Sequence, residues 1–363
     1  MPASLLTPAD LQIREITDPT ELESLAPEWR SLWERCPHMH CFQRPEWLLP
    51  WVRHFYRGEN IRTLAFRSSG RLVGLAPLFL HRHHLDFEVR QISFIGAGIT
   101  DYLDILCEPE FTSAVGDSLL EYLLENRHCW DLCDLQELPP HSAVLTAQLP
   151  EGLRHASLPG SICPVATLPE SEAAFDESLR GRFKNLRRTL HHIERDPTIQ
   201  ISIAGPTDYS DYLQDLIRLH GERWKERRES GMFANAQIRG FHQDVAPGFA
   251  QAGILRAFRM SSENQPVSVW YGFAAHGRYY AYLTGFDPEF ARLSPGQALL
   301  AYSMKTAIRE GVRTYDFLRK TEPFKHRWGG MDTPNGRLLL WHAQSRLPGP
   351  DFVEQARAEL EPE

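Results

Sequence analysis

The stretch "ARLSPGQALLAYSMKTAIREG", residues 291–311, contains the signals of a helix start. Ser294 is a preferred N-cap residue, and Pro295 fits the first helical position. Gln297 lies three residues after Ser294, where its side chain can close a capping box. The stretch therefore predicts a helix that begins at Pro295, with Ser294 as its N-cap.

The same helix start has the features of an anion site. The first amide groups of a helix have no partners within the helix, and the macrodipole adds partial positive charge there. Gly296 permits a ligand to approach the backbone, and Arg292 adds a full positive charge. Two interpretations are open: an anion site built from Arg292, Ser294, Gly296 and Gln297, or a well-capped helix start preceded by an exposed arginine.

Strand-like segments flank this helix on both sides. "RYYAYLTG" (278–285) precedes it and "TYDFL" (314–318) follows it. A strand, a helix and a second strand in the same direction form a βαβ crossover, which requires a parallel strand pair. We therefore expect a mixed sheet with helices packed against it.

The first half of the chain repeats this order of elements. A hairpin expected over 61–82 matches one expected over 254–285, and each contains the tripeptide Ala-Phe-Arg, at 65–67 and 257–259. The first hairpin is followed by "DYLDIL" (101–106), a helix from about Phe111 to Asn126, and the strand "WDLCDLQEL" (130–138). The matching order indicates an internal duplication.

Composition restricts the function classes. The chain has 363 residues, 42% hydrophobic and 24% charged, with a formal net charge of -8, which argues against a general DNA-binding protein. The six cysteines form no CxxC pair, so we expect reduced core residues and no metal site. We also expect a cytoplasmic protein, since no signal peptide and no apolar run of membrane-spanning length is present.

Two segments are locally basic. The segment 175–193 has an apolar stripe at helical spacing, and its other face carries Arg180, Arg182, Lys184, Arg187 and Arg188. A second helix expected in "YLQDLIRLHGERWKERRESG" (212–231) has a basic end from Arg223 to Arg228 and contains Trp224, which is either a core residue or a ligand platform. These faces are either solvated or bind phosphates or an acidic polymer.

Taken together, the motifs of the second half resemble the CelD-like and BioF-type acetyltransferases, a branch of the GNAT superfamily related to the FemAB peptidyltransferases. The resemblance rests on the tyrosine-rich strand, Asp287, the Ser-Pro-Gly start, "YDF" around Asp316, and Lys325 with Trp328 in "FKHRWG". It implies an α/β fold with α+β mixed sheets, arranged as two tandem GNAT-like lobes that share an interlobe cleft. The expected lobes are residues 1–165 and 166–363, the second with the acyl-donor site.

The resemblance assigns ligands to these residues. Arg292, Ser294, Gly296 and Gln297 would bind the diphosphate of acetyl-CoA or another acyl-CoA, with no metal involved. The GNAT phosphate loop usually has its arginine or glutamine one residue closer to the glycine than Arg292 is here. FemAB relatives keep the fold but take activated acyl groups from other carriers.

The resemblance also suggests roles in acyl transfer. Asp316 is the candidate base that removes the acceptor's proton, or else a structural carboxylate. Lys325 would neutralise the departing thiolate or hold an acidic substrate, or else it is a surface residue. The candidate substrate-binding residues are Asp101, Tyr102, Trp224, Tyr282 and Trp328.

Three functions are open at this point. The first is transfer of an acyl group from acyl-CoA to an amine or hydroxyl of a small molecule or of a glycan or cell-envelope precursor. The second is FemAB-type transfer from aminoacyl-tRNA, for which the basic helices would bind the tRNA. The third is a non-catalytic binding module on the same fold.

Overall fold

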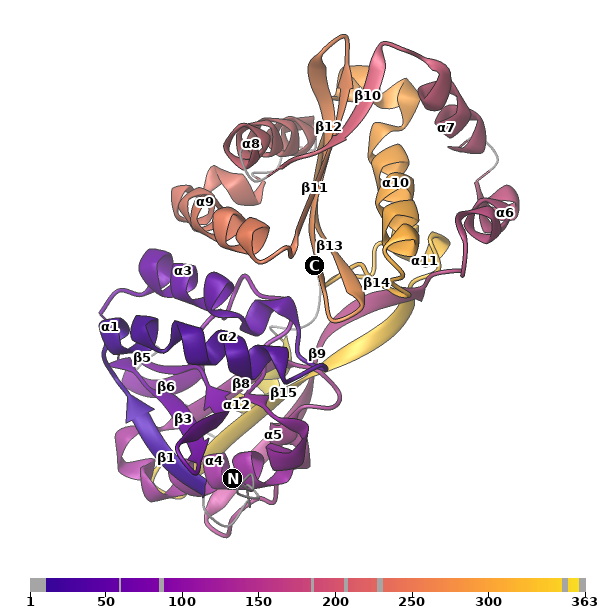
Figure 1. Cartoon of the computed structure of the whole chain (residues 1–363). Coiled ribbons are helices and arrows are strands. Elements are labelled where there is room, and N and C mark those ends of the chain that lie inside the picture. Colours follow the sequence, from indigo (N-terminus) through magenta and orange to yellow (C-terminus); the bar gives the residue numbers. More distant parts are fainter. Residues whose placement is uncertain are drawn as a thin grey trace, which may run out of the picture. The chain divides into compact units, whose positions relative to one another are not determined.

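The chain divides into two compact units (Figure 1). The computed structural model describes residues 11–58, 60–84, 88–183, 186–205, 208–226, 231–347 and 352–358. The first unit comprises Met1–Ile162 and Pro334–Glu363, and the second comprises Cys163–Thr333. The predicted lobes, 1–165 and 166–363, differ from these units in two respects: the first boundary lies three residues earlier, and the last segment of the chain belongs to the first unit.

The first unit contains two sheets. One has the strand order β1-β3-β4-β7, and the other contains the order β9-β15-β8-β6-β5-β2. The strands are β1 (Leu11–Ile16), β2 (Asn60–Ile61), β3 (Thr63–Ser68), β4 (Arg71–Ala76), β5 (Leu78–His84), β6 (Glu88–Phe94), β7 (Leu106–Cys107), β8 (Leu132–Leu138), β9 (Leu153–Thr167) and β15 (Met331–His342). The helices are α1 (Pro19–Ser24), α2 (Ala26–Glu34), α3 (Pro45–Phe55), α4 (Thr112–Glu125), α5 (Ala143–Thr146) and α12 (Phe352–Ala358).

The second unit is built on a sheet with the strand order β10-β11-β12-β13-β14-β9. Its strands are β10 (Ile199–Ile203), β11 (Leu255–Ser262), β12 (Gln265–Ala275), β13 (Arg278–Phe286) and β14 (Thr314–Asp316), together with the end of β9. Its helices are α6 (Glu172–Arg182), α7 (Leu186–Arg195), α8 (Tyr209–Glu226), α9 (Ala236–Gln251), α10 (Pro295–Arg309) and α11 (Pro323–Arg327). Figure 1 shows α8 and α9 on one face of this sheet and α10 on the other.

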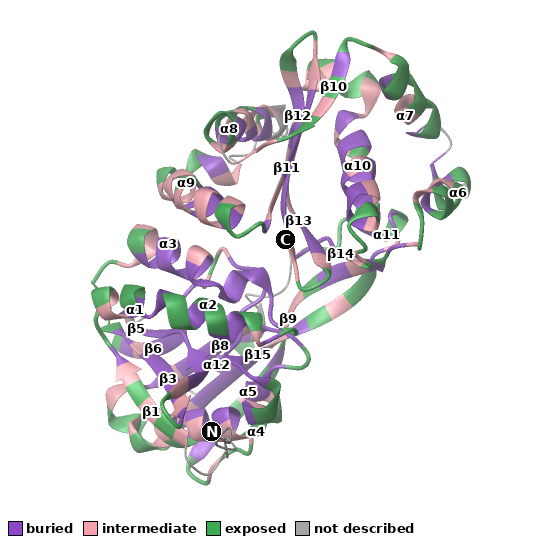
Figure 2. Ribbon diagram, viewed as in Figure 1, coloured by how far each residue is buried: buried purple, intermediate pink, exposed green. Residues whose placement is uncertain are grey.

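Burial explains why α10 forms where the sequence predicts it. Leu300, Met304 and Ala307 recur at intervals of four and three and are at most 6% exposed, so they form a buried face of the helix. Figure 2 shows this buried face of α10 in purple, as well as the buried strands beneath it. The helix begins at Pro295, as predicted.

The expected internal duplication is present in the topology. In the first unit, antiparallel β3, β4, β5 and β6 are followed by α4 and by β8, which pairs in parallel with β6. In the second unit, antiparallel β11, β12 and β13 are followed by α10 and by β14, which pairs in parallel with β13. The two orders match if β12 corresponds to β4 and β5 together, which only Pro77 separates.

One strand assignment in the first half is wrong. "DYLDIL" was expected to pair in parallel with "WDLCDLQEL", but only Leu106 and Cys107 of this region are a strand, β7, and they pair antiparallel with β4. The backbone amide of Ile105 donates to Oδ1 of Asp104, a local hydrogen bond that competes with a strand ladder.

Candidate functional site

The candidate site lies in the second unit, where β13 and β14 stop pairing. Three parallel pairs join them: Arg278 with Thr314, Tyr279 with Tyr315, and Tyr280 with Asp316. β13 continues to Phe286, and within the described residues its later pairs are with β12 alone. Beyond its pairs with β14, these six residues of extended strand span about 20 Å, a length that matches a long, thin ligand.

A β-bulge re-aims the side chains in this half of β13. Tyr271 of β12 is opposite Leu283, whereas its neighbour Gly272 is opposite Ala281. Tyr282 is therefore the extra residue, and the bulge breaks the regular alternation of side chains at this position. The Tyr282 ring lies 5.4 Å from the His242 ring, centroid to centroid, and its side chain is half-buried.

The α10 helix start differs from the prediction in its cap. Ser294 has φ +45°, a left-handed conformation, and its side chain makes no capping hydrogen bond, so the predicted capping box with Gln297 is wrong. The cause is the 3-10 turn Pro288–Leu293 directly before it, which the Ser294 amide closes by donating to the carbonyl of Ala291 at 2.9 Å. An N-cap side chain reaches the helix amides from extended backbone, which Ser294 does not have.

The helix start is nevertheless accessible. A Cβ atom added at Gly296 would meet only the Phe286 ring, at an ordinary 3.7 Å. Arg292 and Gln297 are exposed, and Ser294 and Gly296 are half-buried. The four predicted donor-binding residues are thus brought together beside the far end of β13, with open space over the backbone.

Asp316 lies at the other end, opposite Tyr280 of β13, and is fully buried. Its Oδ2 accepts a hydrogen bond from Nη1 of Arg278 at 2.7 Å, and its Oδ1 accepts from the amide of Leu318 at 2.9 Å. Sequence reasoning missed Arg278. Its position at the start of the tyrosine-rich strand could have indicated this ion pair. In the parallel pairing Arg278 is opposite Thr314, which is two residues before Asp316.

The first unit has the same arrangement at the same register. Asp134 ends the three parallel pairs between β6 and β8, as Asp316 ends those between β13 and β14. Asp134 is also buried, and it forms an ion pair with Arg337 at 2.8 Å. A buried aspartate with an arginine partner at both positions supports a structural role for Asp316 beside the proposed catalytic one.

Lys325 fixes the loop that follows Asp316. Its Nζ donates to the carbonyl oxygens of Leu318, Arg319 and Lys320 at 3.1, 2.5 and 2.9 Å, and it lies 2.9 Å from the Glu322 carboxylate. Leu318 and Lys320 both have left-handed backbone conformations, with φ +59° and +78°. Lys325 and Asp316 therefore hold the same residue, Leu318, by its carbonyl and its amide.

Both tryptophans of the predicted site have internal contacts. Trp328 is 6% exposed and packs 4.5 Å from the Phe183 ring, within the core between α10, α6 and α7. Trp224 is half-buried on α8 and donates from Nε1 to Nε2 of His220 at 2.8 Å. Their proposed contacts with substrate remain predictions.

Next to Trp224, aromatic and histidine rings fill the space between β13 and helices α8 and α9. The Phe233, Tyr271 and Tyr282 rings surround the His242 ring within 5.4 to 5.6 Å. Burial lowers the pKa of His242 to about 3, so this imidazole is neutral at physiological pH. The hydroxyl of Tyr212, on α8, is buried with no hydrogen-bond partner among the described residues. Of these residues the sequence analysis named Tyr282 as a candidate substrate-binding residue. It missed the others, because single histidines and tyrosines show no spacing pattern.

The two predicted residues of the first unit are buried. Asp101 is 6% exposed and Tyr102 is 2% exposed. The Tyr102 ring stacks on His40 at 3.8 Å, and the carbonyl of Asp101 accepts a hydrogen bond from Asn335 at 3.0 Å. Nearby Asp104 is 1% exposed, and burial raises its pKa to about 7.

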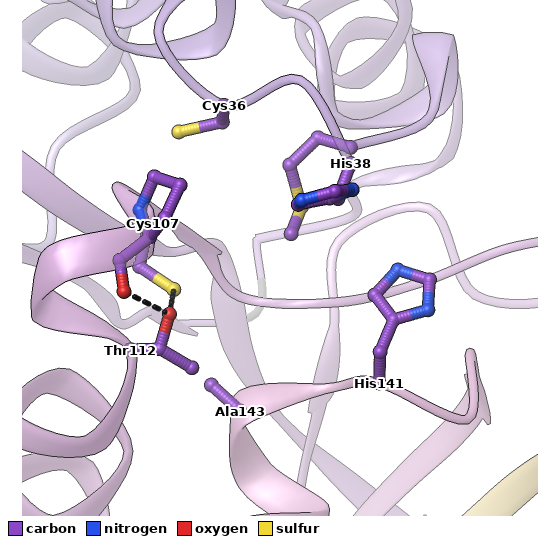
Figure 3. Close-up of a pocket in the computed structure, with 8 residues that line it drawn as sticks. Cys36, His38, Cys107, Thr112, His141 and Ala143 are labelled. Carbon is purple, nitrogen blue, oxygen red and sulfur yellow. Dashed lines mark hydrogen bonds between the residues drawn. The ribbon is translucent and has the colours of Figure 1, made fainter.

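A pocket of about 180 Å³ lies in the first unit (Figure 3). Cys36, Met39 and Cys107 are buried in its wall, and the exposed rings of His38 and His141 lie at its edge. Burial raises the pKa of both thiols to about 12, so they are neutral and weakly nucleophilic. The described residues contain no group of three or more potential metal ligands, and they include no helix long and apolar enough to cross a membrane.

Comparison with known proteins identifies the second unit. Residues 180–326, which include α10, β13 and Lys325, match the family model described as an acetyltransferase (GNAT) domain. No curated protein sequence matches the chain.

Solved structures share the fold over almost the whole chain. The crystal structure of FemX superposes with a TM-score of 0.62 at 12% identity, covering 90% of this chain and 96% of FemX. The C-terminal domain of a candidate lysylphosphatidylglycerol synthetase from Agrobacterium fabrum has a TM-score of 0.55 at 12% identity, covering 92% and 96%. A conserved protein of unknown function from Bacteroides thetaiotaomicron has 0.56 at 12% identity, covering 91% and 99%. At this identity the likeness shows the fold alone: the chain shares the fold of FemX, and its residues 180–326 match the acetyltransferase (GNAT) domain.

Proposed function

We propose that the protein is an acyltransferase that moves an acyl group from acyl-CoA to an amine or hydroxyl of a small molecule or of a glycan or cell-envelope precursor. The observation that carries this proposal is the stretch of β13 beyond its pairs with β14, which runs from the Tyr280–Asp316 pair to the open start of α10 inside the acetyltransferase-matched segment. A thioester donor has a matching shape, with a diphosphate at one end and the reactive carbonyl at the other.

The donor's two ends require different chemistry. The diphosphate would lie at the α10 start, where unpartnered amides, the macrodipole and Arg292 favour negative charge. The amide-containing arm would lie along β13, beyond its pairs with β14. The thioester would then reach the region of Tyr282 and Asp316.

In this proposal Asp316 receives the proton of the acceptor and Lys325 keeps the adjoining loop in place. The ion pair with Arg278 stabilises the anionic carboxylate, so Asp316 is present as a base but a weak one. Much of the rate enhancement would then come from holding the thioester and acceptor together, which can contribute about 7 to 11 kcal/mol. Asp101 and Tyr102 are proposed to act on the acceptor side.

Transfer from aminoacyl-tRNA is the second candidate, favoured by the exposed arginines of α6 and α7. Calorimetric titration of the purified protein with acetyl-CoA and with tRNA separates the two. The acyl-CoA proposal expects saturable binding of acetyl-CoA and no specific binding of tRNA. Binding of tRNA alone would replace it by the second candidate, and binding of neither would favour a non-catalytic module.

A further inference from the structure

The helices α6 and α7 carry an unusual excess of basic residues. Residues 180–195 contain five arginines and one lysine but a single acidic residue, Glu194, in a chain of formal net charge -8. Lys184 lies outside the described residues. We call the exposed side chains of Arg182, Arg187, Arg188 and Arg195 the α6–α7 basic surface.

These arginines differ from most others in the protein. Arg182, Arg187, Arg188 and Arg195 have no acidic partner among the described residues, although all four are exposed. Arginines elsewhere are commonly paired, with partners within 4 Å, among them Arg35, Arg67, Arg90, Arg256, Arg278 and Arg337. Unpaired, exposed guanidinium groups on one surface favour an anionic partner that supplies carboxylates or phosphates.

The opposite faces of α6 and α7 are packed in the core of the second unit. Leu179, Phe183, Leu186 and Ile193 are buried beneath it, and Asp176 of α6 forms an ion pair with Lys305 of α10 at 2.8 Å. The surface is therefore carried on helices that pack directly on α10, whose start is the proposed donor site. A partner bound there would lie on helices that pack against α10, and the Asp176–Lys305 ion pair is ten residues, about 15 Å, along α10 from its start.

The chemistry of the surface favours a protein over a nucleic acid or a membrane. The exposed carboxylates of Glu177 and Glu194 lie among the arginines and would repel a phosphate backbone. No exposed large hydrophobic side chain lies in the described part of 172–195, so an apolar face for lipid is lacking there. The exposed rings of this segment are the imidazoles of His191 and His192, and each lies within 4 Å of a carboxylate, Glu194 and Asp196 respectively. The charge of the α6–α7 basic surface is mixed but mainly positive, and an acidic helix of a partner protein would complement it.

We propose that an acidic carrier protein docks on the α6–α7 basic surface and presents its acyl thioester to the site at which acyl-CoA binds. This inference rests on the proposed function, and it deepens that function by naming a second form of the donor. A carrier-bound pantetheine ends in the same thioester as coenzyme A but lacks the diphosphate. Such a donor needs fewer contacts to phosphate at the α10 start. There, Arg292 lies one residue farther from Gly296 than the arginine of the usual GNAT phosphate loop.

The test compares two donors on two variants. The probe is an acetylated acyl carrier protein of bacterial fatty acid synthesis, titrated beside acetyl-CoA. The variant Arg187→Glu with Arg188→Glu reverses two charges of the basic surface. The matched control, Arg154→Glu with Arg346→Glu, makes the same charge change on exposed arginines of the first unit.

The proposal expects the α7 variant to bind the carrier protein about tenfold more weakly or worse, while the control variant binds as the parent does. Acetyl-CoA binding should be kept in both, which also shows that the donor site is folded. Equal carrier binding by all three proteins, or none by the parent, would overturn the proposal. So would tighter binding of a 20-base-pair RNA duplex than of the carrier protein. Failure of acetyl-CoA to bind is a separate outcome that counts against the proposed function.

Discussion

The variant Lys325→Met tests whether Lys325 has a structural or a catalytic role. Methionine keeps the length and apolar stem of the side chain but removes the ammonium group. The three loop carbonyls of Leu318, Arg319 and Lys320 then lose their common donor. We expect the variant to lose stability in the second unit and to lose activity only to the extent that it unfolds.

The magnitude follows from the contacts. A hydrogen bond to a charged group contributes about 1.5 to 3 kcal/mol, and breaking a buried charged network by removing one partner costs about 3 to 5 kcal/mol. The left-handed conformations of Leu318 and Lys320 add backbone strain that the ammonium group no longer offsets. A loss of about 3 to 5 kcal/mol corresponds to a fall in melting temperature of about 10 °C for a unit of this size.

The assay is thermal melting together with acetyl-CoA binding at a temperature where the variant is folded. Lys320→Met is the matched control, because it removes an exposed ammonium group from the same loop. Its melting temperature should stay within about 2 °C of the parent. If Lys325→Met melts with the parent but transfers acyl groups far more slowly, the lysine acts in catalysis and this reasoning is refuted.

Three more predictions concern buried ionisable groups. If Asp316 is the base, Asp316→Asn should slow single-turnover transfer about a hundredfold or more at unchanged donor affinity; a joint loss of melting temperature and affinity would assign it to structure instead. Burial depresses the folded-state pKa of His242 to about 3. Below about pH 6.5 the unfolded chain therefore binds a proton at this imidazole that the folded chain does not bind. The free energy of unfolding should then fall by at most about 1.4 kcal/mol per pH unit toward pH 4. His242→Phe should flatten that part of the melting profile, and an unchanged profile would place the titration elsewhere. The folded-state pKa of Asp104 is raised to about 7, so its protonated form stabilises the fold below pH 4 and that contribution is lost as pH rises to 7. Asp104→Asn should therefore gain stability relative to the parent between pH 4 and pH 8, and a constant difference would contradict the assignment.

The second unit could be predicted largely from local sequence signals. The start of α10, its strand neighbours and the parallel pairing follow from Pro295 and from the order of strand-like and helical segments, and each is present. The hairpins and the helix near 111–126 were likewise predicted, because their turn residues and apolar spacing are local. Lys320 has a φ of +78°, a left-handed conformation that glycine adopts at less cost.

The parts that could not be predicted depend on contacts distant in sequence. The prediction of a Ser294 capping hydrogen bond was wrong because Ser294 follows the turn Pro288–Leu293 and has a left-handed backbone. No single residue of the sequence indicates this conformation. The partners of Asp316 and Lys325 are set by how β14 and its loop fold back, so a role assigned from the motif alone missed their hydrogen bonds. The pocket of the first unit joins residues from Cys36 to Ala143, beyond the reach of any spacing rule.

The most direct measurement is calorimetric titration of acetyl-CoA into the parent protein and into Gly296→Asp. A side chain at this position meets nothing closer than 3.7 Å, so the variant should fold and melt as the parent does. Its carboxylate would stand where the diphosphate is proposed to bind, and like charges in one site repel by several kcal/mol. The account predicts saturable binding by the parent and binding weakened at least about tenfold in the variant. Equal affinity of both folded proteins, or no binding by the parent, would contradict the claim that the α10 start binds the acyl donor.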